Sequence, residues 1–137
     1  MDGRTRELCK QLRAMQSAEA ASWLMENYKI DGGQLGEAFT LVAHRSWTKS
    51  DQLRLARYFL QDIPFGSPYP LRAFATFMPI RTLVMVIREH LPRVTKDRLG
   101  LLRYFLSPLI SEKSLTDADV TAGKDLIKEL KRLEAAE

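Results

Sequence analysis

The sequence predicts an all-α protein of about seven or eight helices packed as a compact bundle. Apolar residues recur at spacings of three and four positions along almost the whole chain, which is the period of a helix buried on one face. Sustained alternation of apolar and polar residues, which is typical of a half-buried strand, is scarce. Several of the periodic segments also begin with a residue that favours a helix N-terminus. These observations together favour helices along the whole chain.

Four helices are expected in the first half of the chain. The periodicity places them at about residues 4–15, 17–28, 34–46 and 48–63. Ser17 is a good N-terminal cap for the second helix. Thr48, followed three residues later by Asp51, gives the fourth helix a capping-box pattern.

The second half of the chain begins with a loop at residues 64–70, because three prolines there remove backbone donors and cannot continue a helix. Helices are then expected at about residues 71–77, 79–90, 95–109 and 116–133. Residues 82–87 alone would also fit a buried strand, but a single strand among helices has no partner. Thr95 and Thr116 are the expected caps of the last two helices, and Leu115 is placed to pack on Val120 as a hydrophobic staple.

One stretch of the sequence occurs twice. Residues 53–60 and 99–106 share six of eight identities at an offset of 46 positions. A period of this length is typical of stacked helix hairpins of the HEAT and armadillo kind, so one interpretation is two related hairpins side by side. Phe59 and Phe105 would then occupy similar buried positions. The other interpretation is that core helices share Leu, Tyr and Phe by composition alone.

Length and composition are those of one globular domain spanning residues 1–137, with 45% hydrophobic and 28% charged side chains. The longest uninterrupted apolar run, residues 83–87, falls far short of the roughly 18 residues that a membrane span needs. We therefore expect no membrane association. A lone thiol, Cys9, and an N-terminus without a secretory signal favour a cytoplasmic location.

The sequence carries no motif for catalysis. His44, His90 and Cys9 have no metal-ligand spacing, and neither a Gly-x-Ser-x-Gly elbow nor a phosphate-binding loop occurs. We expect no catalytic, cofactor-binding or metal-binding residues. The glycines at 32, 33 and 36 open a helix where free amides could hold an anion, although such glycines more often turn the chain. An enzyme site assembled across helices is the remaining alternative.

The positive charge of the chain is concentrated in one segment. Residues 67–110 carry seven basic groups against two acidic ones, within a net charge of +4. The candidate partner-binding residues in this segment are Arg72, Arg81, Arg88 and Arg103. Arg81 and Arg88 lie two helical turns apart and therefore share one face, which suits an acidic protein or a nucleic-acid backbone. The alternative is a solvated surface, with arginines paired to the acidic C-terminal helix.

The proline loop provides a second candidate surface. Phe65 and Tyr69 either fold back onto the core or are exposed as aromatic anchors for a protein partner.

Residues 55–60, 63–64, 91–92 and 101–106 together resemble the helical core of Rho GTPase-activating domains. The resemblance covers less than half of the chain. The arginine-bearing Gly-x-[Phe/Tyr]-Arg loop of that family and its Asn-Lys-Met-Thr pattern are both absent. No residue role is therefore carried over.

The preferred hypothesis is a non-enzymatic protein–protein interaction module, acting as an adaptor, an inhibitor or an immunity-type protein. The arginine-rich face, the proline loop, or both would bind the partner. The competing hypothesis is a nucleic-acid-binding regulatory protein that uses residues 72–103. The sequence predicts neither the partner nor the oligomeric state.

Overall fold

A computed structural model describes residues 1–136 and confirms the all-α prediction. This part of the chain forms eight α-helices and one short 3₁₀ helix, with no strand. The helices are α1 (Gly3–Ala14), α2 (Ser17–Asn27), α3 (Leu35–Val42), α4 (Lys49–Phe59), α5 (Tyr69–Ala75), α6 (Ile80–His90), η1 (Leu91–Arg93), α7 (Lys96–Lys113) and α8 (Asp117–Ala135). Residues 82–87 lie within α6, so they are helical as expected.

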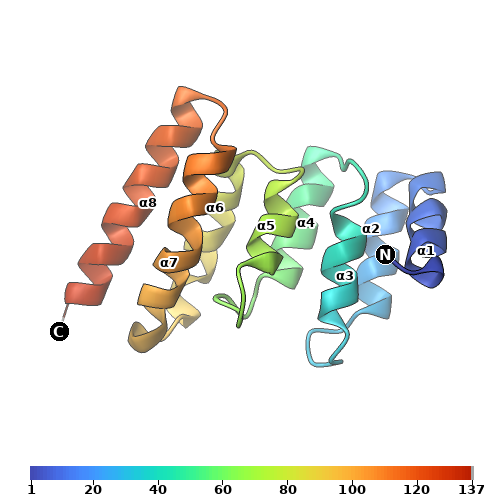
Figure 1. The fold of residues 1–137 in the computed structure, drawn as a ribbon, viewed down its shortest axis with the longest axis horizontal. Helices are drawn as coiled ribbons and strands as arrows, with labels where there is room; N and C mark the ends of the chain where they lie inside the picture. Colours follow the sequence, from blue (N-terminus) through green and yellow to red (C-terminus); the bar gives the residue numbers. More distant parts are fainter. Residues whose placement is uncertain (137) are drawn as a thin grey trace.

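The helices form two layers that run the length of the molecule (Figure 1). One layer contains α1, α3, α5 and α7, and the other contains α2, α4, α6 and α8. Within each layer a helix packs against the next helix of that layer, and α7 and α8 also pack closely on each other. Because consecutive helices alternate between layers, the chain advances along the stack one antiparallel pair at a time, as in α-solenoids.

An aromatic cluster around Phe39 of α3 lies in the middle of this stack. The Phe39 ring centroid is 6.1 Å from that of Phe59, 5.4 Å from that of Phe65 and 6.3 Å from that of Phe74, all in edge-to-face geometry. Phe59 on α4 and Phe74 on α5 are almost completely buried. The cluster joins both layers and anchors the proline loop through Phe65.

Two of the three predicted threonine caps are confirmed by side-chain hydrogen bonds. The hydroxyl of Thr48 accepts from the backbone N–H of Asp51 at 3.3 Å, and that of Thr116 accepts from the N–H of Asp119 at 3.1 Å. Thr95 occupies the N-cap position of α7, but its side chain makes no capping hydrogen bond. The sequence therefore located all three helix starts.

Two other predicted contacts at helix starts are wrong. Ser17 is the first residue of α2 rather than its cap, and its hydroxyl donates instead to the buried Asp51 carboxylate at 2.6 Å, which joins α2 to α4. The staple between Leu115 and Val120 does not form, because Leu115 is 88% exposed. Both apolar side chains lie at the surface at the start of α8.

Several helix ends differ from the predicted ones. The helix predicted at 34–46 ends at Val42, because the buried indole of Trp47 donates to the Val42 carbonyl at 2.9 Å and holds the turn. The helix predicted at 48–63 ends at Phe59, and α5 begins inside the predicted loop, at Tyr69. Pro68 precedes this helix as its N-cap residue.

The seventh helix continues through Pro108 to Lys113, although we expected it to end near residue 109. A proline inside a helix costs about 3 kcal/mol because it removes one hydrogen bond and crowds the preceding turn. Leu109 and Ile110 lie beyond the proline and are buried, at 0% and 8% exposure. Burial of these two side chains offsets the cost.

The two copies of the repeated sequence lie in different layers of the stack. Residues 53–60 lie mainly on α4, in the even-numbered layer, whereas residues 99–106 lie on α7, in the odd-numbered layer. A translation along the stack therefore cannot superpose the two segments. Phe59 and Phe105 are nevertheless both buried, at 1% and 7% exposure. The stack of helix pairs is real, and the 46-residue similarity as its repeating unit stays a prediction.

Candidate protein-binding groove

All four candidate arginines form ion pairs with carboxylates. The pairs are Arg72–Glu112 at 2.8 Å, Arg81–Asp119 at 3.0 Å, Arg88–Glu129 at 2.8 Å and Arg103–Glu134 at 2.6 Å. Three of the four acids lie on α8, so the pairing with an acidic C-terminal helix that the sequence left open is what the structure shows. The four guanidiniums do not form a bare positive surface.

Arg81 and Arg88 share one face of α6, as their spacing predicted, and both pair with carboxylates of α8. Asp119, which is 1% exposed, accepts hydrogen bonds from the Arg81 side chain and backbone N–H at 3.0 and 3.1 Å. It also accepts from the backbone N–H of Leu115 at 3.2 Å. Burial opposes ionisation of Asp119, but these hydrogen bonds and the Arg81 charge lower its pKa. This pair joins α6 to the start of α8 and is part of the fold.

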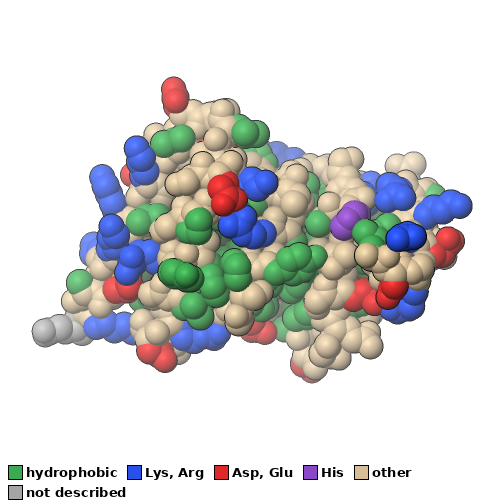
Figure 2. Space-filling model, in the orientation of Figure 1, with side chains coloured by type: hydrophobic (Ala, Val, Ile, Leu, Met, Phe, Trp, Pro, Cys, Tyr) green, Lys and Arg blue, Asp and Glu red, His purple; other side chains and the backbone are tan. Residues whose placement is uncertain are grey.

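Arg72 and Arg103 instead line a groove between α5 and α7, in the odd-numbered layer. The groove has a volume of about 740 Å³. Its lining residues are Pro68, Arg72, Gly100, Arg103, Tyr104, Phe105, Ser107 and Pro108, and we call it the Tyr104 groove. Figure 2 shows hydrophobic side chains gathered on the surface over α7 and the start of α5.

Tyr104 is the most exposed aromatic side chain of the described part of the chain, at 74%. Tyr104 is not among the site residues predicted from the sequence, which considered residues 99–106 only as a possible repeat of core residues. Leu102 and Leu106 of α7 are both buried, and Tyr104 lies two positions from each of them. Two positions correspond to about 200° around a helix, which places Tyr104 on the opposite, outer face. That periodicity was the available signal.

The two aromatic residues of the proline loop have different environments. Phe65 folds back onto the core and contacts Phe39, so it is not a free anchor. Tyr69 is 44% exposed, and its hydroxyl lies 2.9 Å from the Thr40 hydroxyl in a hydrogen bond between α5 and α3. Pro68, next to Tyr69, lines the Tyr104 groove. The proline loop therefore adjoins the Tyr104 groove, and its Phe65 ring holds the loop against the core.

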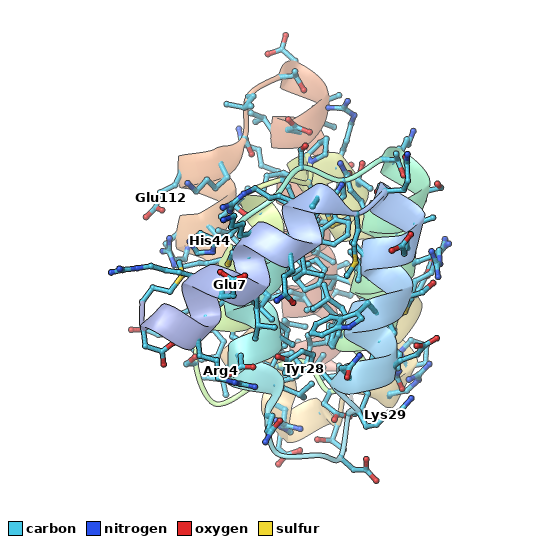
Figure 3. All side chains as sticks on the ribbon, turned by 90° about the vertical axis from the view of Figure 1, so that its right-hand side faces the viewer. Arg4, Glu7, Tyr28, Lys29, His44 and Glu112 are labelled. Atoms are coloured by element: carbon cyan, nitrogen blue, oxygen red, sulfur yellow. The ribbon has the colours of Figure 1, made fainter. Side chains whose placement is uncertain are left out.

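A polar cluster joins α1, α2 and α3 at the other end of the stack. Figure 3, viewed from the α1 end, shows Arg4 and Tyr28 on the same side of the molecule. Glu37 accepts hydrogen bonds from both the Arg4 guanidinium and the Tyr28 hydroxyl. Burial first, and then the Glu37 hydrogen bond and charge, raise the pKa of Tyr28 to about 12. The cluster holds three helices together, and Glu37 also lines a shallow groove of about 550 Å³ between α1 and α3.

Other chemically reactive side chains lie apart from the Tyr104 groove. Cys9 and His90 are each 3% exposed, and His44 hydrogen-bonds the Thr40 backbone carbonyl through Nδ1 at 2.6 Å. Within residues 1–136, no group of three His, Cys, Asp or Glu side chains is placed to hold a metal ion. No helix in this range is both long enough and apolar enough to cross a membrane.

No protein-family model matches the sequence. Searches of curated proteins and of solved structures also find no match. The resemblance to Rho GTPase-activating domains gains no support. The fold and the groove define the class of protein instead, which is a stack of helix pairs with an exposed aromatic groove on one layer.

Proposed function

We propose that the protein is a non-enzymatic protein–protein interaction module, such as an adaptor, an inhibitor or an immunity-type protein, that binds its partner at the Tyr104 groove. The observation that carries the proposal is the 74% exposure of Tyr104 in a groove also lined by Arg72 and Arg103. Tyrosine and arginine are enriched among the residues that dominate binding energy at protein interfaces. A tyrosine also loses little side-chain entropy when a partner covers it.

The arginines of the groove retain hydrogen-bonding capacity although both are paired. Glu112 accepts from Nη1 and Nη2 of Arg72 at 2.8 and 3.4 Å, and Glu134 accepts from Nε and Nη2 of Arg103 at 2.6 and 3.0 Å. A guanidinium has five N–H groups, so each arginine has donors left for carbonyl or carboxylate oxygens of a partner. A cytoplasmic setting is part of the proposal, since a single free thiol is compatible with a reducing compartment.

The test compares affinities for a partner captured from the native cell, identified by mass spectrometry and then purified. Tyr104→Ala should raise the Kd about 30-fold or more, the effect of losing a contact worth roughly 2 kcal/mol. Met85→Ala is the control, because Met85 is 43% exposed on α6 in the other layer. Equal affinities of wild type and Tyr104→Ala would place the binding surface elsewhere and overturn the proposal.

Nucleic-acid binding by residues 72–103 is the competing proposal, supported by the excess of basic groups in that segment. A fluorescently labelled duplex DNA and a single-stranded RNA serve as probes. Nucleic-acid binding predicts affinity that falls steeply between 50 and 200 mM salt, by about three orders of magnitude for six phosphate contacts. Since Arg72, Arg81, Arg88 and Arg103 are each paired with a carboxylate, we expect no such binding.

A further inference from the structure

The two ends of the stack differ in character. At one end, α1 exposes a polar set of side chains, namely Arg6, Glu7, Lys10 and Arg13. At the other end, no helix of the described chain covers the outer side of the α7–α8 pair (Figure 1). Stacked-helix proteins normally need a polar outer surface on the terminal unit, because an apolar one remains open to association. The α7–α8 end does not have such a surface throughout.

This end contains an apolar groove, distinct from the Tyr104 groove although both grooves touch Ser107. We call it the α7–α8 groove; its volume is about 440 Å³. Ile110, Val120 and Ile127 are its apolar lining residues. The adjacent α8 position is Gly123, where a Cβ atom would lie 2.3 Å from Ile110 Cγ2. The glycine therefore allows α7 and α8 to approach closely beneath the groove.

The spacing of the lining residues suits a third helix. Those on α8 lie at positions 120, 124, 127 and 128, and those on α7 and its C-cap residue lie at 107, 110, 111 and 114. Both sets follow the three- and four-residue spacing of one helical stripe. Two such antiparallel stripes form a groove into which the apolar face of an amphipathic helix can pack.

The charges lining the groove are all positive. Lys124 and Lys128, one helical turn apart on α8, are the ionisable side chains among the lining residues. Neither lysine forms an ion pair within the described part of the chain. The groove therefore favours acidic groups beside an apolar stripe.

A second copy of the chain does not fit this requirement. A symmetric dimer through the groove would place Lys124 and Lys128 against the same two lysines of the partner copy. A head-to-tail contact would bring the mostly basic surface of α1 against them. Like charges facing each other across an interface disfavour both arrangements.

We propose that the α7–α8 groove binds an amphipathic α-helix of a partner protein, whose apolar stripe packs on Ile110, Val120 and Ile127 while acidic side chains at its edge pair with Lys124 and Lys128. This binding does not depend on the Tyr104 groove or on the proposed function.

The experiment uses two designed fluorescein-labelled helical peptides of 18 residues as probes, measured by fluorescence anisotropy. Both peptides carry the same Leu and Ile stripe, flanked by Glu in one peptide and by Lys in the other. The wild type should bind the Glu peptide at least tenfold more tightly than the Lys peptide. The double variant Lys124→Glu, Lys128→Glu should reverse that preference.

The control variant is Lys10→Glu, Lys29→Glu, whose lysines are exposed and lie on α1 and just after α2. It lowers the net charge by the same four units, two for each substitution, and should keep the wild-type preference. Tyr104→Ala should keep it as well, which separates this proposal from the proposed function. Circular dichroism confirms that each variant is folded.

Three outcomes would overturn the proposal. The first is absence of Glu-peptide binding at 1 mM wild-type protein, and the second is a preference that Lys124→Glu, Lys128→Glu does not change. The third is wild-type self-association in sedimentation experiments that Ile127→Asp abolishes, since a second copy would then occupy the groove.

Discussion

At the scale of single residues, His90 is the most consequential polar group in the core. It is 3% exposed, and neither ring nitrogen has a hydrogen-bond partner. Burial, followed by the charge of Arg93, lowers its pKa below the ordinary 6.5; Glu89 and the nearby backbone of Ala56, whose geometry is too poor for a hydrogen bond, act in the opposite direction, and Arg57 acts in the same one. The neutral imidazole is thus the form that the folded chain accommodates.

Stability should therefore fall as the pH drops below about 6.5. Above that value His90 is neutral in both states, and below it the unfolded chain takes up a proton before the folded one. The free energy of unfolding should fall by at most about 1.4 kcal/mol at pH 5.5, which is the limit for one proton bound only by the unfolded chain over one pH unit. The carboxylates with lowered pKa, Asp51 and Asp119, lose their contribution only at lower pH, near and below 3.8. Urea unfolding at pH 7.0 and 5.5 measures the effect.

The control for this prediction is the exposed histidine. His44→Leu should keep the loss of stability between pH 7.0 and 5.5, whereas His90→Leu should remove most of it. Equal pH dependence in wild type and His90→Leu would show that another group is responsible.

Arg81 and Arg88 are not equivalent, although both lie on α6 and both pair with carboxylates of α8. Arg81→Glu would place a carboxylate beside buried Asp119 and should destabilise the fold by roughly 1–3 kcal/mol. Arg88→Glu opposes Glu129, whose side chain is 31% exposed, and should cost less than about 1 kcal/mol. Urea midpoints compare the two variants, and equal losses would contradict this account.

At the scale of helices, two glycines offer opposite predictions. A Cβ at Gly123 would collide with the branched, buried Ile110 side chain at 2.3 Å, so Gly123→Ala should destabilise by roughly 1–3 kcal/mol. A Cβ at Gly100 would meet only the flexible end of Glu134, at 3.0 Å. Gly100→Ala should therefore be neutral or stabilise by up to about 1 kcal/mol through helix propensity. Thermal unfolding distinguishes them, and similar shifts in Tm would refute the packing argument.

Phe59 and Phe105 allow a second test of helix packing. Their burial predicts that Phe59→Ala and Phe105→Ala each cost roughly 3–5 kcal/mol. Phe59 should be the more sensitive, since its ring contacts both Phe39 and Tyr58 in the centre of the stack, whereas Phe105 lines the Tyr104 groove. Urea unfolding gives both values, and a loss below 1 kcal/mol at Phe59 would contradict the cluster's role.

The sequence predicted helix starts better than helix ends. Thr48 and Thr116 act locally, through a hydroxyl bonded to an amide three residues on, and such signals can be read from a few letters. The end of α3 depends instead on Trp47, whose indole reaches back five residues, and the passage of α7 through Pro108 depends on burial of Leu109 and Ile110. Those contacts are tertiary, so no local pattern contains them.

The candidate site was predicted only in part for the same reason. The sequence identified the arginines as a group, but their carboxylate partners lie 31–41 positions away along the chain. Whether an arginine is bare or paired depends on which helix lies beside it. Tyr104, in contrast, could have been assigned to the surface from its position opposite Leu102 and Leu106.

At the scale of the whole molecule, stacking makes stability a property of neighbouring helices. Each helix contacts the next helix of its layer, so the ends of the stack have fewer partners than the middle. At one end of the stack, α8 packs extensively on both α6 and α7 and so makes up for its missing outer neighbour. At the other end, α1 packs chiefly on α3. We therefore expect the α1 end to open at the lowest free energy.

Arg45 is the contact that most directly restrains this end. Its Nη1 donates to the carbonyls of Leu12 and Met15 at 2.8 and 3.1 Å, where α1 ends, and its guanidinium lies 4.5 Å from the Trp47 ring centroid. Arg45→Ala removes these contacts without touching the opposite end of the stack. The loss of stability should remain local to the α1 end, because energetic coupling along the stack passes only between neighbouring helices.

Native-state hydrogen exchange should show this directly. In the wild type, amides of α1 should exchange faster than those of α4 and α6. Arg45→Ala should accelerate exchange in α1 at least tenfold while leaving α7 and α8 unchanged. Lys10→Ala, an exposed substitution on α1 itself, is the control and should have no such effect. Uniform acceleration across all helices would mean that the molecule opens as one cooperative unit, because only global unfolding would then expose the α1 amides.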